Sequence, residues 1–170
     1  MSITSIAGKL FVPRQKELQH YQNGAEKMQD EVLKYLVNTA ASTEYGRNHL
    51  FKTIHSYDDF AKNVPLNTYE ELKGDIDRMR HGESDILWPG SVKWYAKSSG
   101  TTNDKSKFIP VSHDGLQRIH YQGGKDVVAL YLRNNPNSRL FDGRSLILGG
   151  SHSPNYNLPG SLVGDLSAIL

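Results

Sequence analysis

Apolar side chains recur every three or four residues through the first part of the chain. Over residues 13–41 this spacing places them along one side of a helix, while charged and amide side chains fill the other side. The pattern predicts one long helix that starts at Pro13, a residue suited to a first helical turn. Its polar side mixes both signs of charge, unlike a membrane-surface helix, so we expect the helix to pack in a core.

Two capping signatures predict shorter helices further along. Ser56 is followed by Asp59, and Thr68 is followed by Glu71, each at the spacing at which the acidic side chain can bond back to the start of its helix. The second of these helices is expected to stop near Gly82. Both starts are local patterns and depend on no distant partner.

Beyond about residue 86 the pattern changes from helical to extended. Residues 92–96 and 107–111 are short runs rich in aromatic or β-branched side chains, which favours strands. Residues 97–106 between them form a loop of small polar residues. A further apolar run at 145–148 predicts a buried strand that leads into two glycines.

A helix is predicted over 113–133, although Gly123-Gly124 in its middle costs roughly 1 kcal/mol per glycine against alanine. That cost indicates a kink or a close approach by another group. Asp165 starts a short helix near the end of the sequence. Together the elements predict an α/β chain, with a helical section over about 1–85 and a strand–loop–strand–helix section over about 86–170.

Composition narrows the classes of function. The chain has 170 residues, no cysteine and a net charge of +2 from 20 basic and 18 acidic side chains. The lack of cysteine excludes disulfide scaffolds, thiolate metal sites and cysteine nucleophiles. The near-neutral charge argues against a dedicated nucleic-acid binder. The longest apolar run, Val127 to Leu132, is too short to span a membrane, and no signal peptide is recognised at the start, so we expect a cytoplasmic protein.

Other candidate sites have simpler explanations. The seven histidines are scattered, without metal-ligand spacing, so we expect no metal site in the protein. The run Gly149 to Ser153 ends in serine where a nucleophile elbow needs glycine, which favours a strand-to-loop turn. Trp88, Trp94 and Tyr95 could stack on the bases of a single-stranded nucleic acid. No basic stripe accompanies them, so buried aromatic side chains fit better.

The loop between the two strands carries the candidate chemistry. Gly100 lets the backbone approach a ligand closely, and successive N–H groups in such a turn can bind an anion. The short hydroxyl side chains around it add donors, and Lys105 or Lys107 adds positive charge. These features suit a polyphosphate, although the spacing is not that of a Walker A loop. A hydrophilic hairpin turn is the alternative interpretation.

This loop also resembles a known motif. Ser98-Ser99-Gly100-Thr101-Thr102, a variable stretch and Lys107-Phe108-Ile109-Pro110 resemble the first nucleotide motif of adenylate-forming enzymes, and more narrowly that of the auxin-responsive acyl acid–amido synthetase family. Thr43 to Gly46, Val64 to Leu66 and Ile86 to Gly90 resemble that family in the same order. Asn103-Asp104 departs from it, because a glycine is common there.

The resemblance implies a fold, a reaction and a set of ligands. The chain would be part of the large N-terminal domain of an ATP-dependent ligase that joins a carboxylic acid to an amino acid through an acyl-adenylate, releasing pyrophosphate and then AMP, with Mg²⁺ on the phosphates. The resemblance places six residues on the nucleotide: Ser98, Ser99, Gly100, Thr101, Thr102 and Lys107, the last of which would neutralise charge on the pyrophosphate side. By position it places four on the acyl or amino substrate: Arg118, Tyr121, Val163 and Gly164. It implies no nucleic-acid or membrane partner.

The resemblance covers only the first part of such an enzyme. The sequence carries one phosphate-binding motif and ends in an uncapped helix. We therefore expect a fragment, inactive alone, that lacks the rest of the large domain and the C-terminal lid. A non-catalytic nucleotide-binding or interaction module is the alternative, and a single-stranded nucleic-acid binder is a weaker one. The sequence does not identify the acyl acid or the amino acid.

Overall fold

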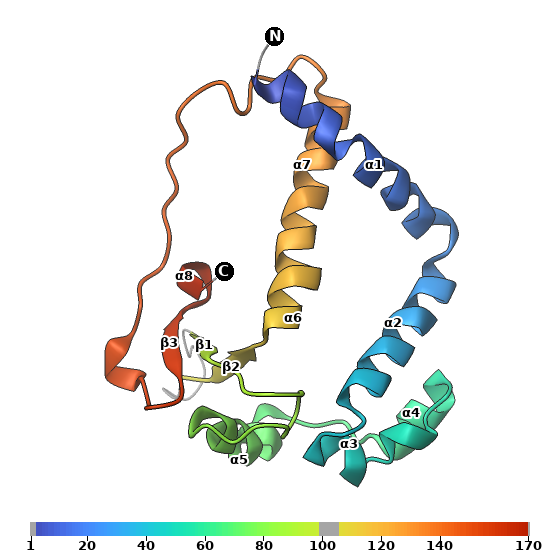
Figure 1. Ribbon diagram of the computed structural model, residues 1–170, viewed down its shortest axis with the longest axis vertical. Coiled ribbons are helices and arrows are strands. Elements are labelled where there is room, and N and C mark those ends of the chain that lie inside the picture. Colours follow the sequence, from blue (N-terminus) through green and yellow to red (C-terminus); the bar gives the residue numbers. More distant parts are fainter. Residues whose placement is uncertain (1–2, 99–105, 170) are drawn as a thin grey trace. The chain divides into compact units, whose positions relative to one another are not determined.

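The computed structural model describes residues 3–98 and 106–169 (Figure 1). The chain divides into two compact units. The helical unit consists of the residues up to Met28 together with Asp114–Leu148. The sheet unit consists of Gln29–His113 together with the stretch from Gly149 onward. The second part of the helical unit is thus inserted in the sequence between the two parts of the sheet unit.

Two long helices form the helical unit. Helix α1 (Ile3–Asn23) packs against α7 (Gln122–Asn134), which is the continuation of a short α6 (His113–Gly115) and a π-helical segment, Leu116–Tyr121 (Figure 1). Arg14 of α1 binds both carboxylate oxygens of Asp126 on α7, and its Nη2 donates to Oδ2 at 2.8 Å. This bidentate pair joins the two helices.

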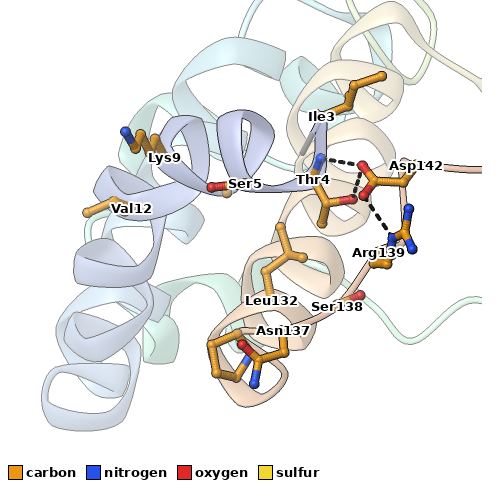
Figure 2. A pocket seen from close by; sticks show the side chains of 12 residues that line it. Ile3, Thr4, Ser5, Lys9, Val12, Leu132, Asn137, Ser138, Arg139 and Asp142 are labelled. Carbon is orange, nitrogen blue, oxygen red and sulfur yellow. Dashed lines mark hydrogen bonds and ion pairs between the residues drawn. The ribbon is translucent and has the colours of Figure 1, made fainter. Parts of the chain in front are cut away.

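The predicted helix over 13–41 is wrong in its limits. The structure has two helices, α1 and α2 (Ala25–Ala40), separated at Gly24, and Pro13 lies inside α1. Helix α1 starts before Pro13 because a residue far away in the sequence caps it. Asp142 Oδ1 accepts hydrogen bonds from the N–H and the hydroxyl of Thr4 at 3.0 and 3.1 Å (Figure 2). A free N–H of the first turn is thereby satisfied. The expectation that this region packs in a core is confirmed at the end of α2, where Val37 is buried. It is not confirmed at Leu10 of α1, which is 77% exposed.

The Arg14–Asp126 pair should matter for stability. Hydrogen bonds from Arg14 lower the pKa of Asp126, and both side chains are largely buried. A lowered pKa in the folded protein gives stability that is present above the unfolded pKa of about 3.9 and is lost as the pH falls through the folded value. We expect Asp126→Asn to lower the free energy of unfolding by about 1–3 kcal/mol at pH 7, and to flatten its loss under acid, as measured by urea unfolding between pH 7 and pH 2.

The exposed pair of Asp30 and Lys34 on α2 provides the control for this prediction. Exposed pairs at this helical spacing contribute only about 0.3–0.5 kcal/mol, so Asp30→Asn should change stability little. Equal decreases in the free energy of unfolding for Asp126→Asn and Asp30→Asn would contradict a special role for the Arg14–Asp126 pair.

The sheet unit is built around three strands. β1 (Trp94–Lys97) lies in the centre, antiparallel to β2 (Phe108–Val111) and parallel to β3 (Leu162–Asp165). Tyr95 of β1 and its neighbour Val163 of β3 pack with Ile76 and Met79 of helix α5 (Tyr69–Arg80). Strands β1 and β2 were predicted from the sequence at 92–96 and 107–111, and each predicted start lies within two residues of the observed one.

A second apolar cluster lies at the end of α2. Phe51 and Ile54 bury against Val37 and Ala40, next to α3 (Glu44–Asn48), a 3₁₀ turn (Phe51–Thr53) and α4 (Tyr57–Asn63). Trp88 packs on this cluster, so it is an aromatic side chain of the core, as expected.

The two capping predictions are confirmed. The Asp59 N–H donates to Ser56 Oγ at 3.2 Å, and the Ser56 N–H donates back to the Asp59 carboxylate at 3.1 Å. The Glu71 carboxylate accepts the N–H and the hydroxyl of Thr68 at 2.6 and 2.7 Å. Hydrogen bonds lower the pKa of both carboxyl groups, from the His55 N–H and then from Ser56 at Asp59, and from Thr68 at Glu71. Helix α5 ends at Arg80, just before Gly82 with φ of +95°.

One further prediction is wrong, and another loses one of its two alternatives. Residues 145–148 form no strand, and Leu146, Ile147 and Leu148 are each at least 85% exposed, because the strand parallel to β1 is Leu162–Asp165 instead. Gly123 and Gly124 mark no close approach, since a Cβ atom on either would meet no atom within 4 Å. The irregular part of that helix is the π-helical segment just before them. The short helix after Asp165 is confirmed as α8 (Leu166–Ile169).

Candidate functional site

The predicted phosphate loop begins and ends on the paired strands β1 and β2. The Ser98 N–H donates to the Lys107 carbonyl at 2.9 Å, and Ser98 Oγ accepts the Lys107 N–H at 3.1 Å. These two bonds close the hairpin and bring the first and last predicted nucleotide residues together. The predicted residues between them, Ser99, Gly100, Thr101 and Thr102, lie outside the described residues.

Helix α5 positions the second strand of this hairpin. Tyr69, the first residue of α5, accepts the Phe108 N–H on its hydroxyl at 2.9 Å. The same tyrosine ring lies 5.4 Å from the Lys107 ammonium group, within the range of a cation–π contact. The Lys107 side chain is therefore oriented by an aromatic ring, and no carboxylate within the described residues forms an ion pair with it.

Two of the predicted substrate residues lie on the neighbouring strand. In the parallel pair, Val163 is opposite Tyr95 and Gly164 is opposite Ala96. Parallel strands present their carboxyl ends at one edge of the sheet, where ligands of open α/β sheets bind. Ser98, the first predicted nucleotide residue, directly follows β1 at that edge. The Val163 side chain is buried in the core, while Gly164 has little free space, since a Cβ there would lie 3.3 Å from Ile169.

The other two predicted substrate residues belong to the helical unit. Arg118 and Tyr121 lie in the π-helical segment, a type of segment common at functional sites. Arg118 pairs with Asp114 at 3.6 Å, and Tyr121 is 44% exposed. Their role in substrate binding stays a prediction, as does that of Val163 and Gly164.

Sequence reasoning missed a cation–aromatic cluster beside the hairpin. The Lys97 ammonium group lies 4.0 Å from the centre of the Tyr156 ring, and the Arg80 guanidinium lies 3.8 Å from that of Phe108. The rings of Phe108 and Tyr156 are themselves 5.9 Å apart. We call Lys97, Arg80, Phe108 and Tyr156 the hairpin cluster. Lys97 and Phe108 carried a sequence signal, since Lys97 directly precedes the hydroxyl-rich loop and Phe108 belongs to the motif after it, whereas Arg80 and Tyr156 carried none.

The segment that resembled a nucleophile elbow has a structural role. The Asp165 carboxylate accepts the N–H and the hydroxyl of Ser151 at 3.0 and 3.3 Å, and the Ser153 N–H donates to the Val163 carbonyl at 2.8 Å. A Cβ on Gly150 would lie 2.6 Å from that of Asp165, so only glycine fits there. The segment therefore lines the outer edge of β3, and the expected strand-to-loop turn is not found, because residues 145–148 form no strand.

Tyr95 is the most buried aromatic residue of the sheet unit. Its side chain is fully buried, and among the described residues its hydroxyl has no hydrogen-bond partner. Burial raises the pKa of Tyr95 to about 12. A buried hydroxyl without a partner costs about 1–3 kcal/mol. We therefore expect Tyr95→Phe to raise the free energy of unfolding by about 1 kcal/mol in urea denaturation.

Tyr57→Phe serves as the control, since Tyr57 is 71% exposed and its hydroxyl faces water in both states. A loss of stability in Tyr95→Phe, with no change in Tyr57→Phe, would mean that an ordered water bonds to the Tyr95 hydroxyl.

The helical unit contains a cavity of its own. A space of about 830 Å³ lies between the start of α1 and the loop after α7, with Lys9, Val12, Leu132 and Arg139 among its walls (Figure 2). Asp142 at its rim binds Thr4 and Arg139. None of the described residues predicted to bind nucleotide or substrate lines this cavity.

Two classes of feature are absent from the described ranges 3–98 and 106–169. No three His, Asp or Glu side chains gather there in a way that could hold a metal ion. No helix in those ranges combines the length and the apolar character needed to cross a membrane.

Comparison with solved structures identifies the class of protein. The chain is similar to the structure titled GH3.15 acyl acid amido synthetase, with a TM-score of 0.76 and 25% identity over 91% of this chain and 27% of that one. The same enzyme in complex with 2,4-DB gives a TM-score of 0.73 and 26% identity. The α/β fold predicted from the sequence is thus confirmed as that of the N-terminal part of such synthetases.

Sequence comparison then gives the family. Residues 14–169 match the GH3 family N-terminal domain, so the chain belongs to the GH3 family. It is 35% identical over 106 residues to indole-3-acetic acid-amido synthetase GH3.15 of Arabidopsis thaliana, covering 61% of this chain and 18% of the relative. It is 29% identical over 110 residues to 4-substituted benzoates-glutamate ligase GH3.12 of the same plant, covering 63% and 19%. The chain thus spans about a fifth of the length of these relatives.

Proposed function

We propose that this chain supplies the phosphate-binding part of an ATP-dependent acyl acid–amido synthetase. The observation that carries the proposal is the hairpin base, where Ser98 and Lys107 are bonded to each other at the carboxyl end of β1, next to the parallel strand β3. A hydroxyl group and a lysine so placed suit a phosphate ligand. Membership of a family whose named relatives are amido synthetases and ligases supports the reaction class.

The proposed reaction has two steps. A carboxylate oxygen of the acyl acid attacks the α-phosphorus of ATP, and pyrophosphate leaves, which gives the acyl-adenylate. The amine of an amino acid then attacks the acyl carbon, the carbon–oxygen bond to AMP breaks, and the amine loses a proton to give the amide. Binding and orientation of the phosphates are the part that this chain would contribute.

The roles of individual residues follow from their placement. Ser98 and the loop residues Ser99, Gly100, Thr101 and Thr102 would donate hydrogen bonds to the phosphates. Lys107, oriented by the ring of Tyr69, would offset negative charge on the departing pyrophosphate. Mg²⁺ would be held mainly by the phosphates of the bound nucleotide.

The relatives suggest the class of acyl substrate. Their names refer to indole-3-acetic acid and to 4-substituted benzoates, and one solved relative holds 2,4-DB. We infer a small carboxylic acid, with an amino acid as the second substrate and no nucleic-acid or membrane partner. We place the reaction in the cytoplasm. Since the chain spans about a fifth of its relatives, we propose that the 170 residues alone bind nucleotide without turnover.

Calorimetry with ATP and AMP, followed by exchange of labelled pyrophosphate into ATP, tests the proposal. The encoded protein should bind ATP, and exchange should depend on an added acid such as indole-3-acetate or a benzoate. Exchange by the 170 residues alone would overturn the proposal that they are incomplete. Binding of ATP without exchange in the complete polypeptide would identify a non-catalytic nucleotide-binding module. Salt-sensitive binding of oligonucleotides without ATP binding would point to a nucleic-acid binder instead.

A further inference from the structure

Lys97 holds a position that the predicted phosphate site does not yet use. It is the last residue of β1 and directly precedes Ser98. Its ammonium group lies 4.0 Å from the centre of the Tyr156 ring. Within the described residues no carboxylate forms an ion pair with it. Asp165, its neighbour across the parallel pair, instead accepts hydrogen bonds from Ser151.

Strand geometry places Lys97 and Lys107 on opposite faces of the hairpin. Lys97 is opposite Phe108, while Ser98 is opposite Lys107. Opposite residues of an antiparallel pair share a face, and successive residues of a strand alternate between faces. The two lysines contact different aromatic rings, since the Lys97 ammonium lies near Tyr156 and the Lys107 ammonium lies near Tyr69. The base of the loop therefore carries a lysine on each face.

Tyr156 is itself held in place. Its carbonyl accepts a hydrogen bond from Arg80 Nη2 at 2.9 Å, and its ring lies 5.9 Å from that of Phe108. Arg80 is not a candidate ligand for phosphate, since its side chain is only 11% exposed and it pairs with Asp77. A flexible lysine loses rotamer freedom when it orders on a ligand. A fixed ring beside the ammonium group orders the lysine before the ligand binds, so less rotamer freedom is lost on binding.

We propose that Lys97 is a second phosphate-binding residue, positioned by Tyr156, which acts with Lys107 so that a polyphosphate is gripped from both faces of the hairpin. This inference rests on the proposed function, because it takes ATP as the ligand. It adds a specificity: ligands with linked phosphates engage both lysines, whereas AMP, with a single phosphate, engages one at most. Lys97 therefore favours ATP and pyrophosphate over AMP.

Calorimetry on the encoded protein with ATP, pyrophosphate and AMP tests this proposal. Lys97→Met should weaken ATP and pyrophosphate binding about tenfold, and change AMP binding less than about twofold. Lys97→Arg should retain most of the affinity. Lys93→Met is the matched control, since Lys93 is an exposed lysine just before β1, and it should change nothing.

Tyr156 variants separate positioning from a merely structural role. Tyr156→Phe keeps the ring and should bind ATP like the unsubstituted protein, whereas Tyr156→Leu should lose part of the affinity that Lys97→Met loses. The affinity of Lys97→Met should also depend less on salt, because one charge contact is missing. Far-UV circular dichroism checks that each variant is folded. Should Lys97→Met fail to fold, Lys97→Gln provides the same comparison.

The outcomes distinguish this inference from the proposed function. If the unsubstituted protein binds ATP and Lys107→Met weakens binding, but Lys97→Met and Lys97→Gln do not, then Lys97 has no phosphate role and the proposed function stands. An equal loss for ATP and AMP would also overturn the specificity. If the unsubstituted protein binds neither ATP nor pyrophosphate, both proposals fail.

Discussion

Replacing Lys107 by methionine should lower the affinity for ATP by about ten- to a hundredfold. A hydrogen bond to a charged group contributes about 1.5–3 kcal/mol, which corresponds to that range of dissociation constants. The hairpin should survive the change, because Ser98 bonds to the backbone of Lys107 and not to its side chain. Methionine keeps the apolar stem that lies near Tyr69 while it removes the charge. Isothermal titration with ATP measures the effect directly.

Lys93→Met controls for the general loss of one positive charge. If Lys107→Met is folded and binds ATP as tightly as Lys93→Met does, the loop is the hydrophilic hairpin turn that its composition also allows. Lys107 would then have no role in phosphate binding, even though the named relatives are synthetases and ligases.

Replacing Gly46 by alanine should lower the free energy of unfolding by about 3 kcal/mol, at the upper end of the usual cost of overpacking. A Cβ on Gly46 would lie 2.0 Å from the carbonyl oxygen of Ala40 and 2.9 Å from its carbonyl carbon. Both are backbone atoms at the end of α2, so the clash cannot be relieved by a side-chain rotation. Urea unfolding followed by circular dichroism measures the loss.

Gly74→Ala is the matched control and should act in the opposite direction. Gly74 lies inside α5, and a Cβ there would meet no atom within 4 Å. Alanine is favoured over glycine in a helix by up to about 1 kcal/mol, so this variant should gain stability. A similar loss in both variants would contradict the close approach at Gly46.

The close approach at Gly46 also explains a sequence pattern. Thr43 is fully buried, its hydroxyl accepts the Gly46 N–H at 3.0 Å, and the same hydroxyl donates to the Ala40 carbonyl at 2.8 Å. The run from Thr43 to Gly46, which resembled the family in the sequence, is thus a compact cap that joins α2 to α3. Its function is structural.

The predictions that held depend on local chemistry. Ser56 with Asp59 and Thr68 with Glu71 each make a bond between residues three apart, so the sequence window contains both partners. The strands around the loop were predicted for the same reason, since β1 and β2 are neighbours in both sequence and space. The candidate phosphate residues at the hairpin base follow from this local pattern.

The predictions that failed depend on distant partners. No residue near Thr4 in the sequence indicates that Asp142 caps α1, so the sequence alone favours a helix start at Pro13. The apolar residues Leu146 to Leu148 have strand character, but the place beside β1 is taken by Leu162–Asp165. Tyr156 was missed because its contact with Lys97 joins segments that are far apart in the sequence.

The position of β1 between an antiparallel and a parallel neighbour has a consequence for folding order. β2 follows β1 after a short loop, whereas the second part of the helical unit, Asp114–Leu148, lies between β2 and β3 in the sequence. For a flexible chain, closing the longer loop costs roughly 1.5 kcal/mol more in entropy than closing the hairpin. The strand pair flanked by Ser98 and Lys107 is therefore the part of the sheet that forms at the lowest entropic cost, and we expect it to form before β3 is added.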